Sequence, residues 1–112
     1  YDGQEAVKGR YVNGRQTLNE NIADLGALAC VTSIAGDDTE ALNSLFTQYA
    51  RIWASKYTEE SMIHRLNTDV HSPAKVRVNA VLSSTEAFYK VYPDLKEGDG
   101  MYAAPEKRVK IW

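Results

Sequence analysis

The chain has 112 residues, of which 44% are hydrophobic and 25% are charged, a composition typical of one globular unit rather than a disordered segment. Its formal net charge is −2, and its lysines and arginines are scattered, which argues against nucleic acid or an anionic membrane as the main partner. No stretch approaches the roughly 20 apolar residues that cross a bilayer. We therefore expect residues 1–112 to form a single unit that binds neither nucleic acid nor membrane.

The first third of the chain predicts a loop followed by a long helix. Residues 1–16 are polar and contain Asn13-Gly14, a dipeptide typical of turns. Residues 17–20 (Thr-Leu-Asn-Glu) fit a capping box that would begin a helix. Nearly every side chain in residues 22–35 is apolar, which predicts a helix that is buried on all sides and ends at Gly36.

That apolar run contains the only cysteine, Cys30. A single cysteine cannot form an internal disulfide, and this usage favours a reducing compartment. We expect the thiol to be buried, as free cysteines usually are.

The strongest periodic signal in the sequence follows. Asp37 or Asp38 can cap a second helix, in which apolar side chains recur every three or four residues, as one helix face requires. These residues are Leu42, Leu45, Phe46, Tyr49 and Trp53. We interpret them as a stripe that faces the core and carries no chemistry.

The remaining elements are shorter. Thr58 can cap a third helix that runs to about residue 66, and residues 67–72 should be irregular because the residue before a proline is pushed out of the α region. Ser72 can itself cap a further turn that begins at Pro73.

Residues 83–86 (Ser-Ser-Thr-Glu) fit another capping box, which leads into a helix over residues 87–91. The pattern of residues 107–112 does not separate strand from coil. The predicted fold is therefore mainly α, with helices joined by long loops.

Two carboxylates stand out at the start of the apolar helix. Glu20 and Asp24 are four residues apart and so share one helix face. A buried carboxylate must be paired, protonated or bound to a metal, and no neighbour at helical spacing supplies a cation. One interpretation assigns Glu20 to the capping box and Asp24 to a basic group elsewhere in the fold; a site for chemistry is the other.

A second group of polar residues lies 45 positions further on. If residues 69–71 are extended, Asp69 and His71 point to the same side, so the carboxylate can hydrogen-bond the imidazole and favour its protonated form. Arg77 could reach the same cavity. By itself this pattern is weak, because a lone histidine is more often structural than catalytic, and His64 has only that structural interpretation.

Together these residues resemble the neprilysin-like zinc metallopeptidases. Residues 19–26 (NENIADLG) resemble the family signature E-N-x-A-D-x-G, and residues 69–79 (DVHSPAKVRVN) resemble D-x-H-S-P-x-x-x-R-V-N. Between them lies an aromatic helix that ends near residues 49–53, and after them come a Met-Tyr pair and a terminal Lys-Arg-Val-x-x-Trp. Each motif alone is modest, whereas the colinear set covers almost the whole chain.

The resemblance implies the C-terminal part of a thermolysin-like catalytic domain with one zinc ion, held by two histidines and a glutamate. Glu20 matches the glutamate ligand, and Asp24 matches the carboxylate that orients a ligand histidine. His71 matches the imidazole that stabilises the developing oxyanion, with Asp69 holding it in place. Arg77 matches the guanidinium that binds a backbone carbonyl of the oligopeptide substrate.

The H-E-x-x-H segment of such enzymes is absent, since His64 and His71 are the only histidines. In the family it lies upstream of the region matched here. The resemblance therefore implies a fragment that is inactive alone, whose zinc comes with the upstream part of the polypeptide. Its apolar helix, left without that part, should drive self-association.

Two further interpretations remain: a non-catalytic helical interaction module, and a relative that has lost zinc binding. The connection over residues 34–42 is shorter than in animal members, and their cysteines near residue 54 and near the C-terminus are lacking. This resembles the intracellular bacterial members, often called endopeptidase O, and predicts a bacterial cytoplasmic location.

Overall fold

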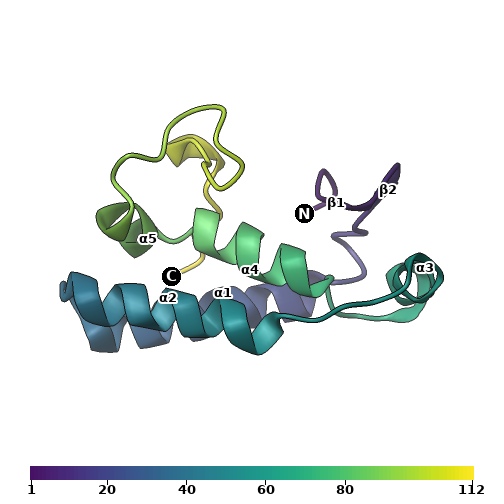
Figure 1. Cartoon of the computed structure of the whole chain (residues 1–112), viewed down its shortest axis with the longest axis horizontal. Helices are drawn as coiled ribbons and strands as arrows, with labels where there is room; N and C mark the ends of the chain where they lie inside the picture. The colour runs from purple at the N-terminus through teal and green to yellow at the C-terminus, as the bar shows by residue number, and fades with distance from the viewer.

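The computed structural model describes residues 1–112 and confirms a mainly α fold. A short β-hairpin precedes five α-helices and a final 3-10 turn (Figure 1). The elements are β1 (Glu5–Val7), β2 (Arg10–Tyr11), α1 (Leu18–Ala35), α2 (Thr39–Trp53), α3 (Glu59–Thr68), α4 (Ala74–Ser83), α5 (Glu86–Val91) and η1 (Pro105–Lys107).

The core lies where α4 crosses α1 and α2, with α5 packed on α2 (Figure 1). Seven buried side chains form the main cluster: Leu25, Leu28, Leu42, Phe46, Val81, Leu82 and Phe88. A smaller cluster of Val12, Val76 and Ala80 joins the N-terminal segment to α4. The long α1–α2 pair thus forms a platform, on which α4 carries one of the two family motifs.

Helix α2 confirms its predicted cap and stripe. The Asp38 carboxylate accepts hydrogen bonds from the backbone N–H groups of Glu40 and Ala41, both at 3.0 Å. Leu42 and Phe46 are fully buried, and the ring of Phe46 meets that of Phe88 edge to face at 5.6 Å. Burial of one face of the helix explains the periodicity.

The capping box at residues 17–20 is wrong, although the helix does begin there. The Thr17 hydroxyl donates to the carbonyl of Asn13 at 3.1 Å and accepts from the side-chain amide of Asn21 at 2.9 Å. It caps no backbone N–H of α1. Since Thr17 is buried next to Asn21, its hydroxyl satisfies that buried amide instead. Glu20 is thereby left without a capping role.

Helix α1 is not buried on all sides in this chain. Leu25 and Leu28 face the core, whereas Leu18, Val31 and Ile34 are exposed, Ile34 by 84%. The expectation of a buried thiol is also wrong, because Cys30 lies on this exposed side. The helix ends at Gly36 as predicted, with a positive φ of 63° that favours glycine. One side of α1 therefore presents apolar surface.

The N-terminal segment is more ordered than the predicted loop. Strands β1 and β2 pair antiparallel, and Gly9 takes up the positive φ of 73° that their connection requires. Asn13-Gly14 follows this hairpin and opens the turn before α1, where the Asn13 side-chain oxygen accepts the backbone N–H of Gln16 at 3.1 Å. The hairpin lies against α3, at the other end of the molecule from α5 (Figure 1).

Of the three caps predicted for the shorter helices, one is confirmed and two are wrong. Thr58 caps α3 as expected, accepting from the backbone N–H of Ser61 at 3.2 Å. Ser72 does not cap α4, because its hydroxyl binds Asn21 in α1. The capping box at residues 83–86 is wrong too: Ser83, which would open it, is the last residue of α4, and its hydroxyl donates to the carbonyl of Ala80 at 3.3 Å. Both hydroxyls donate to nearby oxygen atoms and do not accept from the backbone N–H groups at a helix N-terminus.

The C-terminal tail returns to α1. After η1, residues 108–112 are irregular, and the indole of Trp112 covers Gly26 so closely that a Cβ there would lie 3.0 Å from the ring. The close approach explains a glycine in the middle of a helix. None of the helices is both long and apolar enough to span a membrane.

Candidate functional site

The two family motifs, about 50 residues apart in sequence, meet across α1 and the start of α4. The Ser72 hydroxyl donates to the side-chain oxygen of Asn21 at 2.7 Å, and both side chains are buried. This amide also donates to Thr17, so its hydrogen bonds are divided between α1 and the loop before α4. One satisfied buried hydrogen-bond chain therefore sets the position of that loop relative to α1.

A bidentate ion pair provides the second connection between the motifs. Arg77 in α4 donates from Nε and Nη2 to the two carboxylate oxygens of Asp24 in α1, each at 2.7 Å. The two side chains are only 13% and 12% exposed, which makes this the best-shielded ion pair of the chain. The hydrogen bonds that Arg77 donates to Asp24 raise the pKa of Arg77. The distant basic partner expected for Asp24 is therefore Arg77.

The third connection runs through His71. Its Nδ1 lies 2.9 Å from Asp69 Oδ1, and its Nε2 lies 3.1 Å from Glu20 Oε2. Asp69 follows α3 in extended backbone, as the predicted alternation required, and its Oδ1 also accepts the backbone N–H of His71 at 2.9 Å. The imidazole thus lies between a carboxylate of its own loop and the glutamate of α1.

The charge of Asp69 fixes the hydrogen on the ring nitrogen that faces it. The backbone N–H of His71 lowers the pKa of Asp69, and the imidazole and the Arg65 guanidinium lower it further. An ionised carboxylate only accepts hydrogen bonds, so Nδ1 must carry the hydrogen that Asp69 receives. Asp69 therefore orients the ring, and Nε2 is the nitrogen turned toward Glu20.

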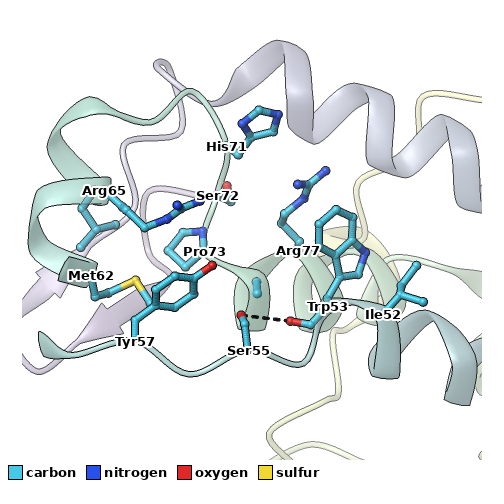
Figure 2. Close-up of a pocket in the computed structure, with 12 residues that line it drawn as sticks. Ile52, Trp53, Ser55, Tyr57, Met62, Arg65, His71, Ser72, Pro73 and Arg77 are labelled. Atoms are coloured by element: carbon cyan, nitrogen blue, oxygen red, sulfur yellow. Dashed lines mark hydrogen bonds between the residues drawn. The ribbon is translucent and has the colours of Figure 1, made fainter.

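An open pocket of about 290 Å³ borders this cluster. Figure 2 shows His71 and Arg77 on its upper side, both directed toward α1, with the indole of Trp53 beside Arg77. The guanidinium carbon of Arg77 lies 3.8 Å from the centre of the indole ring. The other lining residues are Ile52, Ser55, Tyr57, Met62, Arg65, Leu66, Ser72, Pro73 and Ala74. The walls combine apolar contacts with two guanidinium groups.

Sequence reasoning missed the aromatic residues around Arg77. Trp53 and Tyr49 were assigned to a stripe without chemistry, yet Trp53 stacks on Arg77 and the Tyr49 hydroxyl donates to the Arg77 carbonyl at 3.2 Å. Burial, with the negative charge of Asp24, raises the pKa of Tyr49 to about 12. The same two causes raise the pKa of Tyr1, whose hydroxyl is buried without a protein partner. In the sequence, only the position of Tyr49 and Trp53 at the C-terminal end of the apolar stripe indicated that they could lie near the site.

The donor atoms suit one zinc ligand but do not make a complete site. Glu20 lies in the first turn of α1 with its side chain 39% exposed, so one carboxylate remains accessible beside His71. No group of three or more histidine, cysteine, aspartate or glutamate side chains is placed to hold a metal ion. His64 lies on α3, outside the pocket lining. Glu20 can thus supply one carboxylate ligand, fewer than the three protein ligands of a catalytic zinc site.

Comparison with known proteins decides the family. Residues 1–109 match Peptidase family M13. The chain belongs to the M13 peptidases. This confirms the resemblance to the neprilysin-like enzymes, a family that uses zinc. No solved structure gives a significant match.

Several M13 relatives align with the chain over nearly its whole length. It is 42% identical over 113 residues to a neutral endopeptidase of Lactococcus lactis, covering all of this chain and 18% of the relative. A neutral endopeptidase of Lactobacillus helveticus is 41% identical over 90% of the chain and 16% of its own length. Human neprilysin is 29% identical over 93% of the chain and 15% of its own length. The chain therefore spans less than a fifth of these M13 relatives.

The Asp24–Arg77 pair should dominate the local stability of this M13 segment. Asp24→Ala leaves a nearly buried guanidinium without its counter-ion, so we expect the free energy of unfolding to fall by about 3 kcal/mol. Replacing both residues, as Asp24→Ala with Arg77→Met, should cost less, because no charge is then left unpaired. Urea unfolding followed by tryptophan fluorescence measures both.

The exposed pair of Asp37 and Lys90 offers a control, and Asp37→Ala should leave the unfolding midpoint unchanged. If the double variant is less stable than Asp24→Ala alone, the charge of Arg77 does not need Asp24 as its counter-ion.

Proposed function

We propose that the chain is the C-terminal part of a zinc endopeptidase that cleaves oligopeptides, with its zinc site completed by residues of the same polypeptide outside residues 1–112. One observation supports this most: Asn21, Glu20 and Asp24 of one motif each contact a residue of the other motif. A helical interaction module would not require these polar contacts between the two motifs. Membership in the M13 family adds the reaction class.

Each side chain then has a proposed role in peptide hydrolysis. Glu20 would hold zinc, which when bound acts as a Lewis acid and lowers the pKa of a water molecule. His71, oriented by Asp69, would donate a hydrogen bond to the oxyanion that forms from the peptide carbonyl. Arg77 would bind a substrate carbonyl, held in place by Asp24 and Trp53. Asp24 would also orient a histidine ligand from outside this segment.

The full-length protein and the 112-residue chain should behave differently with zinc. We expect the full-length protein to hydrolyse an internally quenched oligopeptide, to lose activity with a chelator and to regain it with zinc. We expect the 112-residue chain to be inactive and to show no tight site in calorimetric titration, because a lone glutamate beside a histidine is short of three protein ligands. Submicromolar, stoichiometric binding by the short chain would contradict the proposal.

A second role, as a helical interaction surface, is favoured by one observation. Only 13 of the 112 residues are buried, and one side of α1 exposes Val31 and Ile34. We propose that the isolated chain covers this apolar side of α1 by contact with a second copy, as symmetric dimers do.

Light scattering over a concentration series should show dimers that disappear in Ile34→Glu, while Glu40→Gln on the surface of α2 leaves them intact. A monomer at every concentration would contradict this proposal.

A bacterial cytoplasmic location stays a prediction that rests on the single cysteine and on the resemblance described above.

A further inference from the structure

A second guanidinium lies behind the contact between Asp69 and His71. Arg65 Nη2 is 2.6 Å from Asp69 Oδ2, while Asp69 Oδ1 faces the imidazole and the backbone N–H of His71. Each oxygen of the carboxylate therefore has its own cationic or N–H partner. Arg65 belongs to neither family motif, and nothing in the sequence pattern singled it out.

Local structure fixes both members of this pair. Arg65 lies in the last turn of α3 and Asp69 is the C-cap residue, four positions on, so their side chains meet on one face. The backbone N–H of Asp69 donates to the carbonyl of Arg65 at 2.8 Å. The guanidinium of Arg65 lies over the ring of Tyr57 at 5.0 Å, and Gln16 donates to the carbonyl of Asp69 at 2.7 Å. The backbone and the side chain of Asp69 are both held.

Arg65 should affect the orientation of Asp69 and His71 more than it affects the free energy of unfolding. Its side chain is 45% exposed, and ion pairs this accessible contribute little to the free energy of unfolding. A carboxylate bound at one oxygen only can turn about its Cβ–Cγ bond, whereas a partner at the second oxygen limits that rotation. The orientation of the His71 ring, which depends on Asp69 Oδ1, is limited with it.

We propose that Arg65 is a positioning residue of this site: it holds Asp69, and through Asp69 the imidazole of His71, in the orientation that the reaction uses. The inference rests on the proposed peptidase function. Arg65 also lines the pocket beside His71 (Figure 2), so a direct contact with substrate is the competing role. Kinetic constants separate the two, because lost orientation lowers kcat and a lost substrate contact raises KM.

The test uses the full-length, zinc-loaded enzyme. We expect Arg65→Ala to lower kcat about fivefold with KM unchanged, less than the roughly 10- to 100-fold typical of a residue that directly orients a functional group. Arg65→Lys keeps a cation near Asp69 and should restore most of the turnover. Arg51→Ala removes an equal charge from the exposed surface at the end of α2 and should change neither constant.

A double-mutant cycle checks the route of the effect. Asp69→Asn should lower kcat further than Arg65→Ala, and adding Arg65→Ala to Asp69→Asn should cause no additional loss, because Arg65 acts only through Asp69. Losses that multiply in the double variant, a change confined to KM, or an unchanged kcat in Arg65→Ala would each overturn the inference. If His71→Ala lowers turnover while Arg65→Ala does not, the inference alone fails; if neither does, the proposed function fails as well.

Discussion

In the full-length protein, Glu20→Ala should remove zinc and with it all zinc-dependent peptidase activity. The structure leaves Glu20 free for this role, because its carboxylate is neither used in a cap nor paired with a basic residue other than His71. Loss of residues that merely support a metal ligand typically weakens binding about 10- to 100-fold, so loss of a ligand should cost more than about 100-fold in affinity. Elemental analysis of the purified variant measures the zinc content.

Glu40→Ala is the matched control for this experiment. Glu40 also lies in the first turn of a long helix and is exposed, but it is at the opposite end of α2 from Trp53, which lines the pocket together with His71. It should retain zinc and full turnover. If Glu20→Ala keeps one zinc ion per chain after dialysis, Glu20 is not a ligand and the assignment of the first motif is wrong.

His71→Ala should leave zinc bound and lower kcat by a factor on the order of 10² to 10³, the usual loss for one donor that stabilises an oxyanion. The reason is that Nε2 is the nitrogen not used by Asp69, so when both ring nitrogens carry a hydrogen it is the donor available to charge that develops in the transition state. Steady-state kinetics together with zinc analysis separate this role from metal binding. His64→Ala removes the only other histidine, on α3, and should change neither quantity.

Two other results of the His71 experiment would contradict the assignment. A rise in KM with kcat unchanged would mean that His71 binds substrate equally in the ground state and the transition state. Loss of zinc from His71→Ala would make it a ligand. The 3.1 Å between its Nε2 and Glu20 Oε2 makes that second result a necessary check.

Local sequence signals predicted the helices well where they reflect burial of one face. Leu42 and Phe46 recur at helical spacing because α2 has a single buried side, and Asp38 caps it by a contact two residues away. The predicted caps at Thr17 and Ser72 were wrong for a shared reason. A hydroxyl can bind any nearby acceptor, and which acceptor lies nearby depends on the packing of other segments.

The candidate site shows the same division. The sequence by itself determined the family and the polar residues of its two motifs, because their order and spacing are properties of the chain. Only the tertiary structure decided that Asp24 pairs with Arg77, that His71 reaches Glu20, and that Trp53 belongs to the site. These are contacts between separate helices and loops, and they form where α4 packs across α1 and α2. No periodicity along the chain records which side chains such packing will bring within hydrogen-bonding distance.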